Sequence, residues 1–79
     1  MELRARIQID DKTLVDVYYS AVTGKTSYAL VRADKRIFGY DNFQFWHVHP
    51  RANPDEHVVC HEPTPDQVLH EMKEILDLE

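Results

Sequence analysis

The stretch LVDVYYSAVTGKTSYALVR, residues 14–32, decides the fold because it contains a complete β-hairpin pattern. Its first part, Leu14 to Ser20, is rich in β-branched and aromatic residues, which favour strands. Thr23-Gly24 follows as a turn, since glycine accepts a positive φ without a clash at Cβ. Residues 26–32 then have the composition of a returning strand. The stretch therefore predicts two antiparallel strands joined by a short turn.

The strand pattern continues on both sides of this hairpin. In LRARIQI, residues 3–9, apolar and polar side chains alternate, which is typical of a half-buried strand. Asp10-Asp11-Lys12 interrupts the alternation with short polar side chains suited to a turn. Residues 33–35 form another turn before a strand at 36–40. We therefore expect residues 1–41 to form four strands of an antiparallel meander.

The end of the chain predicts a helix over 64–78. Thr64 and Gln67 have the spacing of a capping box, and Pro65 falls at the first helical position, where its missing N–H costs nothing. One apolar stripe follows, made of Val68, Leu69, Met72, Ile75 and Leu76. Residues 42–63 are irregular, with short extended pieces expected at 45–49 and 57–61. The expected fold is one α+β domain over 1–79: a four- to five-stranded antiparallel meander with one C-terminal helix packed on one face.

Composition limits the function classes. The chain has 43% hydrophobic residues, one cysteine, no long apolar run and a net charge of −5. An internal disulfide framework and a membrane span are therefore not expected, and we predict a cytoplasmic protein. The charge is uneven, because residues 1–36 carry seven basic and five acidic groups whereas the remainder is strongly acidic. Only the first half could offer nucleic acid a local basic patch. A core this small also favours self-association, so a homodimer or other homo-oligomer is expected.

Four of the five histidines lie within fifteen residues, as His47, His49, His57 and His61. Histidine titrates nearest neutral pH and also binds metals, so this density indicates proton transfer or metal ligation. His47 and His49 are two residues apart and would project from the same side of a strand. Structural hydrogen bonding of the rings is the alternative to either chemistry.

Two kinds of chemistry fit the histidine pair. Cleavage of RNA needs a base for the 2′-OH, an acid for the leaving oxygen and a cation for the developing charge. His47 and His49 could supply the first two, and Arg51 or a sheet arginine such as Arg6 the third. Asp41 could orient a histidine, or it could simply end a strand.

A zinc site is the second possibility. It would use His47 and His49 with one of His57, His61 or Cys60, and we take His61 as the third ligand. Without zinc, no cofactor is expected. Trp46, in an aromatic cluster beside the histidines, could stack on a nucleobase or serve as a core anchor.

The order of these motifs resembles the TumE-like family, short prokaryotic proteins regarded as toxins of toxin–antitoxin pairs. The resemblance rests on Gly39-Tyr40-Asp41-Asn42, the His47 and His49 pair, Glu62-Pro63, and the helix opening at residues 66–72. It extends to site roles for Tyr40, Asp41, Asn42, His47 and His49, with Asn42 assigned to substrate binding. Phe43-Gln44-Phe45-Trp46 departs from the family, where more histidine and basic residues stand.

The resemblance implies a toxin-like role and an antitoxin protein as partner. Taken with the histidine pair, it predicts a toxin-like component that acts on RNA as a metal-independent ribonuclease. A non-enzymatic module for protein interaction or dimerisation, and a histidine-based metal-binding protein, are the alternatives.

Overall fold

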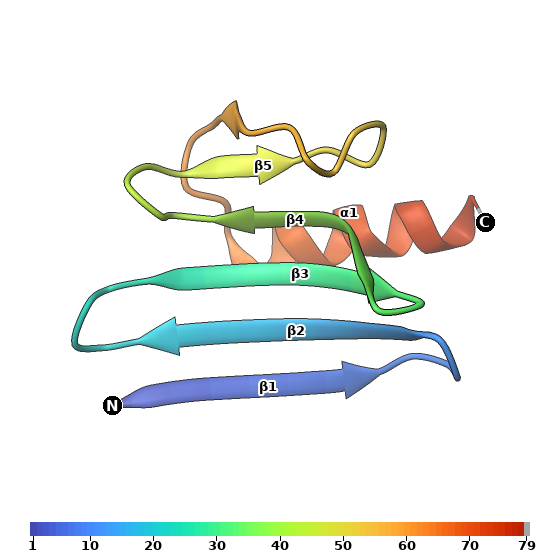
Figure 1. Ribbon diagram of the computed structural model, residues 1–79, viewed down its shortest axis with the longest axis horizontal. Helices are drawn as coiled ribbons and strands as arrows, with labels where there is room; N and C mark the ends of the chain where they lie inside the picture. The colour runs from blue at the N-terminus through green and yellow to red at the C-terminus, as the bar shows by residue number, and fades with distance from the viewer. Residues whose placement is uncertain (79) are drawn as a thin grey trace.

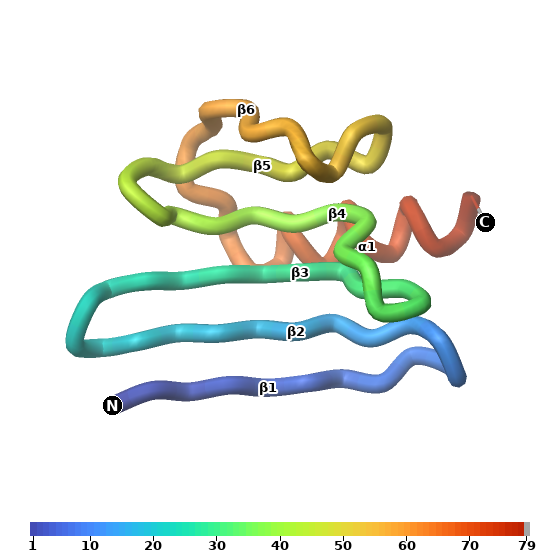
Figure 2. Tube along the Cα trace, viewed as in Figure 1, coloured from blue at the N-terminus to red at the C-terminus, as the bar shows by residue number. Residues whose placement is uncertain are grey.

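The computed structural model describes residues 1–78 and consists of a six-stranded antiparallel sheet with one helix on one face (Figure 1). The strands follow one another in chain order. They are β1 (Glu2–Gln8), β2 (Thr13–Ser20), β3 (Thr26–Arg32), β4 (Lys35–Asp41), β5 (His47–His49) and β6 (Val58–Val59), and the helix is α1 (Pro65–Asp77). The predicted α+β meander is confirmed. The two short extended pieces become β5 and β6 (Figure 2).

Local chemistry explains the connections between the strands. Gly24, between β2 and β3, has φ +74°, a conformation that glycine adopts without strain. Between β3 and β4, Ala33 and Asp34 both have positive φ, as the tight two-residue turns of hairpins require. Before β2, the Asp10 carboxylate accepts a hydrogen bond from Lys12 N at 2.9 Å, which closes that turn.

The core lies between the sheet and α1, which passes behind β3 and β4 in the view of Figure 1. Six buried residues form it: Val15, Leu30, Phe38, Tyr40, Val68 and Met72. Thr64 caps the helix by accepting a hydrogen bond from Gln67 N at 3.1 Å. The Tyr40 hydroxyl donates to Glu71 at 2.7 Å and so ties the helix to β4. This sole helix of residues 1–78 is neither long nor apolar enough to cross a membrane.

The opposite surface of the sheet carries no helix, and we call it the open face. Because side chains alternate along a strand, the neighbours of the core residues Val15 and Tyr40 point to the open face. The strand register places the following residues there: Arg4, Arg6, Asp16, Tyr18, Ser27, Arg36, Asp41, His47 and His49. The histidine pair and several cations of the first half therefore share one surface, away from the acidic helix.

Candidate functional site

The candidate site begins where β4 ends beside β5. Asp41 is the last residue of β4 and pairs with His47, while Gly39 pairs with His49. Val48 lies between the two histidines and packs against the core, so both rings project to the open face. The chain reverses between β4 and β5 through Gln44, whose φ is +69°. This reversal sets the register that puts the Asp41 carboxylate beside both rings.

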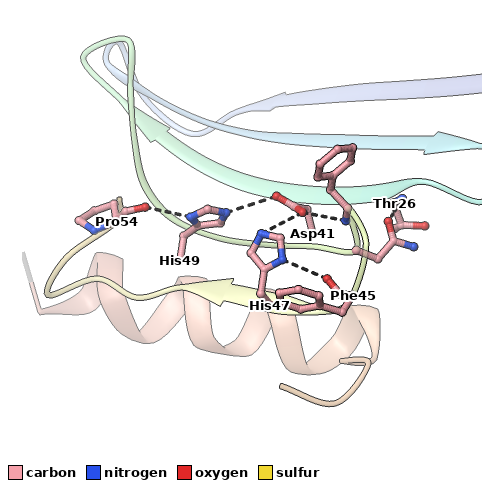
Figure 3. A network of polar contacts seen from close by, with 8 residues as sticks. Thr26, Asp41, Phe45, His47, His49 and Pro54 are labelled. Atoms are coloured by element: carbon pink, nitrogen blue, oxygen red, sulfur yellow. Dashed lines mark hydrogen bonds and ion pairs between the residues drawn. The ribbon is translucent and has the colours of Figure 1, made fainter. Parts of the chain in front are cut away.

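Asp41 lies between the two imidazoles and contacts both (Figure 3). Its Oδ1 is 3.0 Å from His47 Nε2, and its Oδ2 is 3.3 Å from His49 Nε2. The other ring nitrogens face backbone carbonyls: His47 Nδ1 is 3.0 Å from Phe45 O, and His49 Nδ1 is 2.9 Å from Pro54 O. Both rings are thereby held in fixed orientations, with their Nε2 atoms turned to the same carboxylate.

The rings are sealed from water although they lie on the open face. His47 is 3% exposed and His49 is 1% exposed. The loop over residues 50–57 folds back across them. Its last residue, His57, places its ring centroid 4.8 Å from that of His47 and 4.6 Å from that of His49. Three imidazoles therefore pack together, and only His57 remains exposed to solvent.

Burial and neighbouring charges shift the pKa values of His49 and Asp41. Burial lowers the pKa of His49, and the Arg36 guanidinium adds to that effect against the opposing influence of Asp41. Burial alone would raise the pKa of Asp41. Hydrogen bonds from Phe43 N and His49, with the nearby His47, instead hold the pKa of this carboxyl below its usual value. Asp41 is thus a carboxylate near neutral pH.

A hollow of about 670 Å³ opens beside the cluster. It is lined by Lys25, Ser27, Arg36, Asp41, Phe43, Gln44, Phe45, His47 and His57. Two cations and two exposed aromatic rings thus surround the imidazoles. The Lys25 ammonium lies 5.7 Å from the Phe43 ring centroid, within the range of a cation–π contact. Such a hollow suits a ligand that is both anionic and aromatic.

Several residues named from the sequence lie elsewhere. Tyr40 faces the helix and bonds Glu71, and Trp46 packs against the core. The Asn42 side chain accepts from Thr26 N and donates to Gly24 O, so it joins the ends of two turns. All three side chains make contacts within the fold, and Asn42 also lines a second hollow that shares Lys25, Phe43 and Gln44 with the first.

The remaining candidates are spread over the surface. Arg6 is on the open face, at the far edge of the sheet near Asp16. Arg51 is exposed in the loop after β5, and His61 is exposed after β6 and outside the three-histidine group. His57 occupies the position that the sequence reasoning gave to His61. Phe43 and Phe45 belong, with Trp46, to the aromatic cluster expected beside the histidines, and these two rings line the hollow. Lys25 has no such signal, because nothing in its local sequence shows that two separate loops meet here.

Comparisons with protein-family models, with curated proteins and with solved structures return no match for this chain.

Proposed function

We propose that the open face binds an RNA strand and that the strand is cleaved at the histidine cluster. The observation that carries this proposal is the hollow itself, in which imidazoles, a carboxylate and two cations line one concave surface. A phosphodiester in the hollow would meet Arg36 and Lys25, which match its charge. Phe43 and Phe45, 63% and 49% exposed, offer flat surfaces on which bases can stack.

RNA suits this site because the strand brings its own nucleophile, the 2′-OH. The protein then has to move protons and stabilise the charge that develops on the phosphate. His47 and His57 both line the hollow, whereas His49, which is 1% exposed, does not. His47 and His57 are therefore the imidazoles that we assign to contact with substrate. His49 becomes a positioning residue.

The separation of charge supports binding on this face despite the net charge of −5. Arg4, Arg6 and Arg36 lie on the open face, and Asp16 partly offsets the first two at 4.0 and 3.9 Å. The acidic residues of α1 lie on the other side of the sheet. A polyanion approaching the open face would therefore meet local positive charge.

The biological setting that we propose is a toxin-like component of a toxin–antitoxin module, acting in the cytoplasm, where RNA is available. Two features support it: the ordered motifs at residues 39–42, 47–49 and 62–72, and the hollow with chemistry suited to an RNA backbone. The antitoxin partner implied by the same resemblance stays a prediction.

Arg36→Gln tests the RNA proposal. We expect purified protein to cleave an RNA oligonucleotide, and the variant to lose roughly tenfold or more of the cleavage rate because a cation next to the phosphate is gone. Lys35→Gln is the matched control. It makes the same charge change at the adjacent residue, whose register places it on the face opposite the open face, and its cleavage rate should stay within about twofold of wild type. Equal losses in both variants, or no cleavage of any RNA by wild type, would contradict the proposal.

Expression of the protein alone tests the toxin-like role. Wild type should arrest growth, and His57→Ala should relieve the arrest while leaving the fold intact, because His57 is exposed. Harmless expression of folded wild-type protein would argue for a non-enzymatic interaction module.

We further propose that two copies pair through their β1 strands. β1 ends the sheet, and every one of its residues is exposed, so its outer backbone groups are open to another strand. Leu3 and Ile7 of β1 lie on the helix side of the sheet but are 56% and 50% exposed, because α1 passes over β4 instead. With six residues in the buried core, added apolar burial would stabilise the domain. The occupant that matches a seven-residue edge of this kind is a second β1, paired antiparallel about a two-fold axis.

Arg4→Pro should convert the dimer to a monomer. The hydrogen bonds Ile9 N→Thr13 O and Ala21 N→Met1 O place the odd-numbered residues of β1 against β2, so the Arg4 N–H lies at the outer edge, where proline removes it. Sedimentation or light scattering measures the change, and Ala52→Pro in the exposed loop is the control for a proline substitution elsewhere. A wild-type protein that is monomeric at high micromolar concentration would contradict pairing and leave this edge for a different protein.

A further inference from the structure

The histidine cluster has a mismatch between hydrogen-bond donors and acceptors. Each ring of the pair faces two oxygens, one from a backbone carbonyl and one from the Asp41 carboxylate. All four oxygens are acceptors. A neutral imidazole carries one N–H, so two neutral rings can supply two of the four hydrogens required.

The shortfall exists for either tautomer of the two rings. Neither a backbone carbonyl nor the carboxylate has a hydrogen to donate, so each neutral ring must turn one lone pair toward an oxygen. His47 Nε2 is moreover buried and, among residues 1–78, receives no hydrogen bond of acceptable geometry, although Asp41 Oδ1 is 3.0 Å away. Two added protons or one metal cation would supply the positive charge that these facing lone pairs attract.

A second proton on each ring is one way to supply that charge. It would place two imidazolium ions side by side, with ring centroids 4.9 Å apart, beside a third histidine and the Arg36 guanidinium. Both rings are almost completely removed from water, and burying like charges together is costly. One carboxylate cannot balance two such ions and a guanidinium. A single divalent cation placed among the same atoms would supply the charge and satisfy all the lone pairs at once.

We infer that His47 Nε2, His49 Nε2 and the Asp41 carboxylate form a site for a divalent transition-metal ion, with His57 as a further ligand. The donor set is three imidazoles and one carboxylate, which suits zinc and its neighbours and does not suit magnesium or calcium. The carbonyls of Phe45 and Pro54 complete the arrangement. Histidines that ligate a metal commonly donate their second N–H to such a group, which fixes the ring orientation.

The distances fit this assignment. Zinc bonds of about 2.0–2.1 Å separate neighbouring ligand atoms of a tetrahedron by roughly 3.3 Å. The two nitrogen–oxygen distances at Asp41 are 3.0 and 3.3 Å. The ligand atoms of the three histidines lie within 4.8 Å of one another, and the exposed His57 ring can turn to close the remaining gap. His61 lies outside this group, so the third histidine differs from the one chosen from the sequence.

The site deepens the proposed function and rests on it only for the identity of the substrate. With the ion bound, His47 and His57 would act as ligands instead of touching the RNA themselves, and the ion would meet the phosphate. His47, His57 and Asp41 all line the hollow, so the ion would lie at its wall, where it could polarise a phosphate oxygen. Arg36 and Lys25 would then hold the remaining charge of the same phosphate. The binding of the metal itself is measurable without RNA.

Zinc titration of tag-free, chelator-treated protein tests the inference. We expect calorimetry to give one zinc ion per chain, and cobalt(II) in place of zinc to give the visible absorption of a low-symmetry, nitrogen-ligated site. His57→Ala should weaken zinc binding by roughly tenfold or more, because it removes one ligand. His61→Ala is the matched control, since it removes an exposed imidazole four residues away, and it should bind zinc as wild type does.

The outcomes separate this inference from the proposed function. The inference would be overturned if folded wild-type protein bound zinc only with a dissociation constant weaker than roughly 0.1 mM, or not at all. Equal weakening in the His57→Ala and His61→Ala variants would overturn it as well. Zinc binding without cleavage of RNA would leave the metal site standing and remove the proposed function. Cleavage of RNA by protein that binds no zinc would leave the proposed function standing and remove the metal site.

Discussion

Gly39→Ala is expected to lower the free energy of unfolding by about 2–3 kcal/mol, the range of overpacked sites. A Cβ at this position would lie 2.5 Å from the backbone oxygen of Tyr28 and 3.4 Å from Cδ of Arg36. The oxygen belongs to β3, which is hydrogen-bonded to β4, so relief of the clash requires the two strands to separate. Gly39 also pairs with His49, and the strain would therefore reach the site.

Urea unfolding of the two single-glycine variants measures this effect. Gly24→Ala is the matched control, because a Cβ there meets nothing within 4 Å. The Gly24→Ala substitution should lower the free energy of unfolding by about 1 kcal/mol, because alanine is strained at the positive φ of +74°. The larger loss should therefore occur at Gly39, where φ is not positive. A loss at Gly39 no greater than that at Gly24 would contradict the close approach of β3 and β4.

Asp41→Asn is expected to abolish zinc binding, with a loss of roughly a hundredfold or more in affinity, while leaving the metal-free fold as stable as wild type. The two effects have one cause. When both neutral rings carry their hydrogen on Nδ1, the carboxylate of the metal-free protein faces two imidazole lone pairs, whereas an amide can donate Nδ2–H to one of them. Its Oδ1 can still accept the hydrogen bond from Phe43 N, which the carboxylate accepts at 3.0 Å. The substitution could even raise metal-free stability by about 1 kcal/mol, the value of one hydrogen bond.

Paired measurements of unfolding and zinc affinity at about pH 8, where a solvated imidazole is neutral, test this prediction. Asp16→Asn is the control, since it removes the same charge from the same sheet face near Arg4 and Arg6. The control should keep wild-type zinc affinity. Loss of several kcal/mol of metal-free stability in Asp41→Asn, with zinc affinity unchanged, would show that the carboxylate pairs with protonated rings.

Much of the fold was predictable because its signals are local. The turn of the β2–β3 hairpin is indicated by two adjacent residues, Thr23-Gly24. The first strand is indicated by the alternation of apolar and polar side chains over residues 3–9. The helix begins at the residue that Thr64 and Pro65 indicate, because capping depends on immediate neighbours. The sequence does not show that α1 passes over β4 and leaves the helix side of β1 exposed, because that depends on the path of the whole chain.

The candidate site was predictable in part. The shared side of His47 and His49 follows from strand geometry alone. The contact of both rings with Asp41 depends on the register set by the reversal at Gln44, whose positive φ has no clear sequence signal. The grouping of His57, instead of His61, with the pair depends on how the loop over 50–57 folds back. Sequence spacing treats these two histidines alike.

¹⁵N NMR of the imidazole nitrogens of His47 and His49 measures both their tautomers and their ligation of zinc, and is the sharpest test of the metal site. In zinc-loaded protein at about pH 8, each ring should carry its hydrogen on Nδ1, which faces a backbone carbonyl. Addition of one equivalent of zinc should shift both Nε2 resonances to the values of metal-bound nitrogen and leave His61 and His70 unchanged. Rings that carry the hydrogen on Nε2, or Nε2 resonances that do not respond to zinc, would contradict the claim that these two nitrogens and Asp41 converge on a divalent cation.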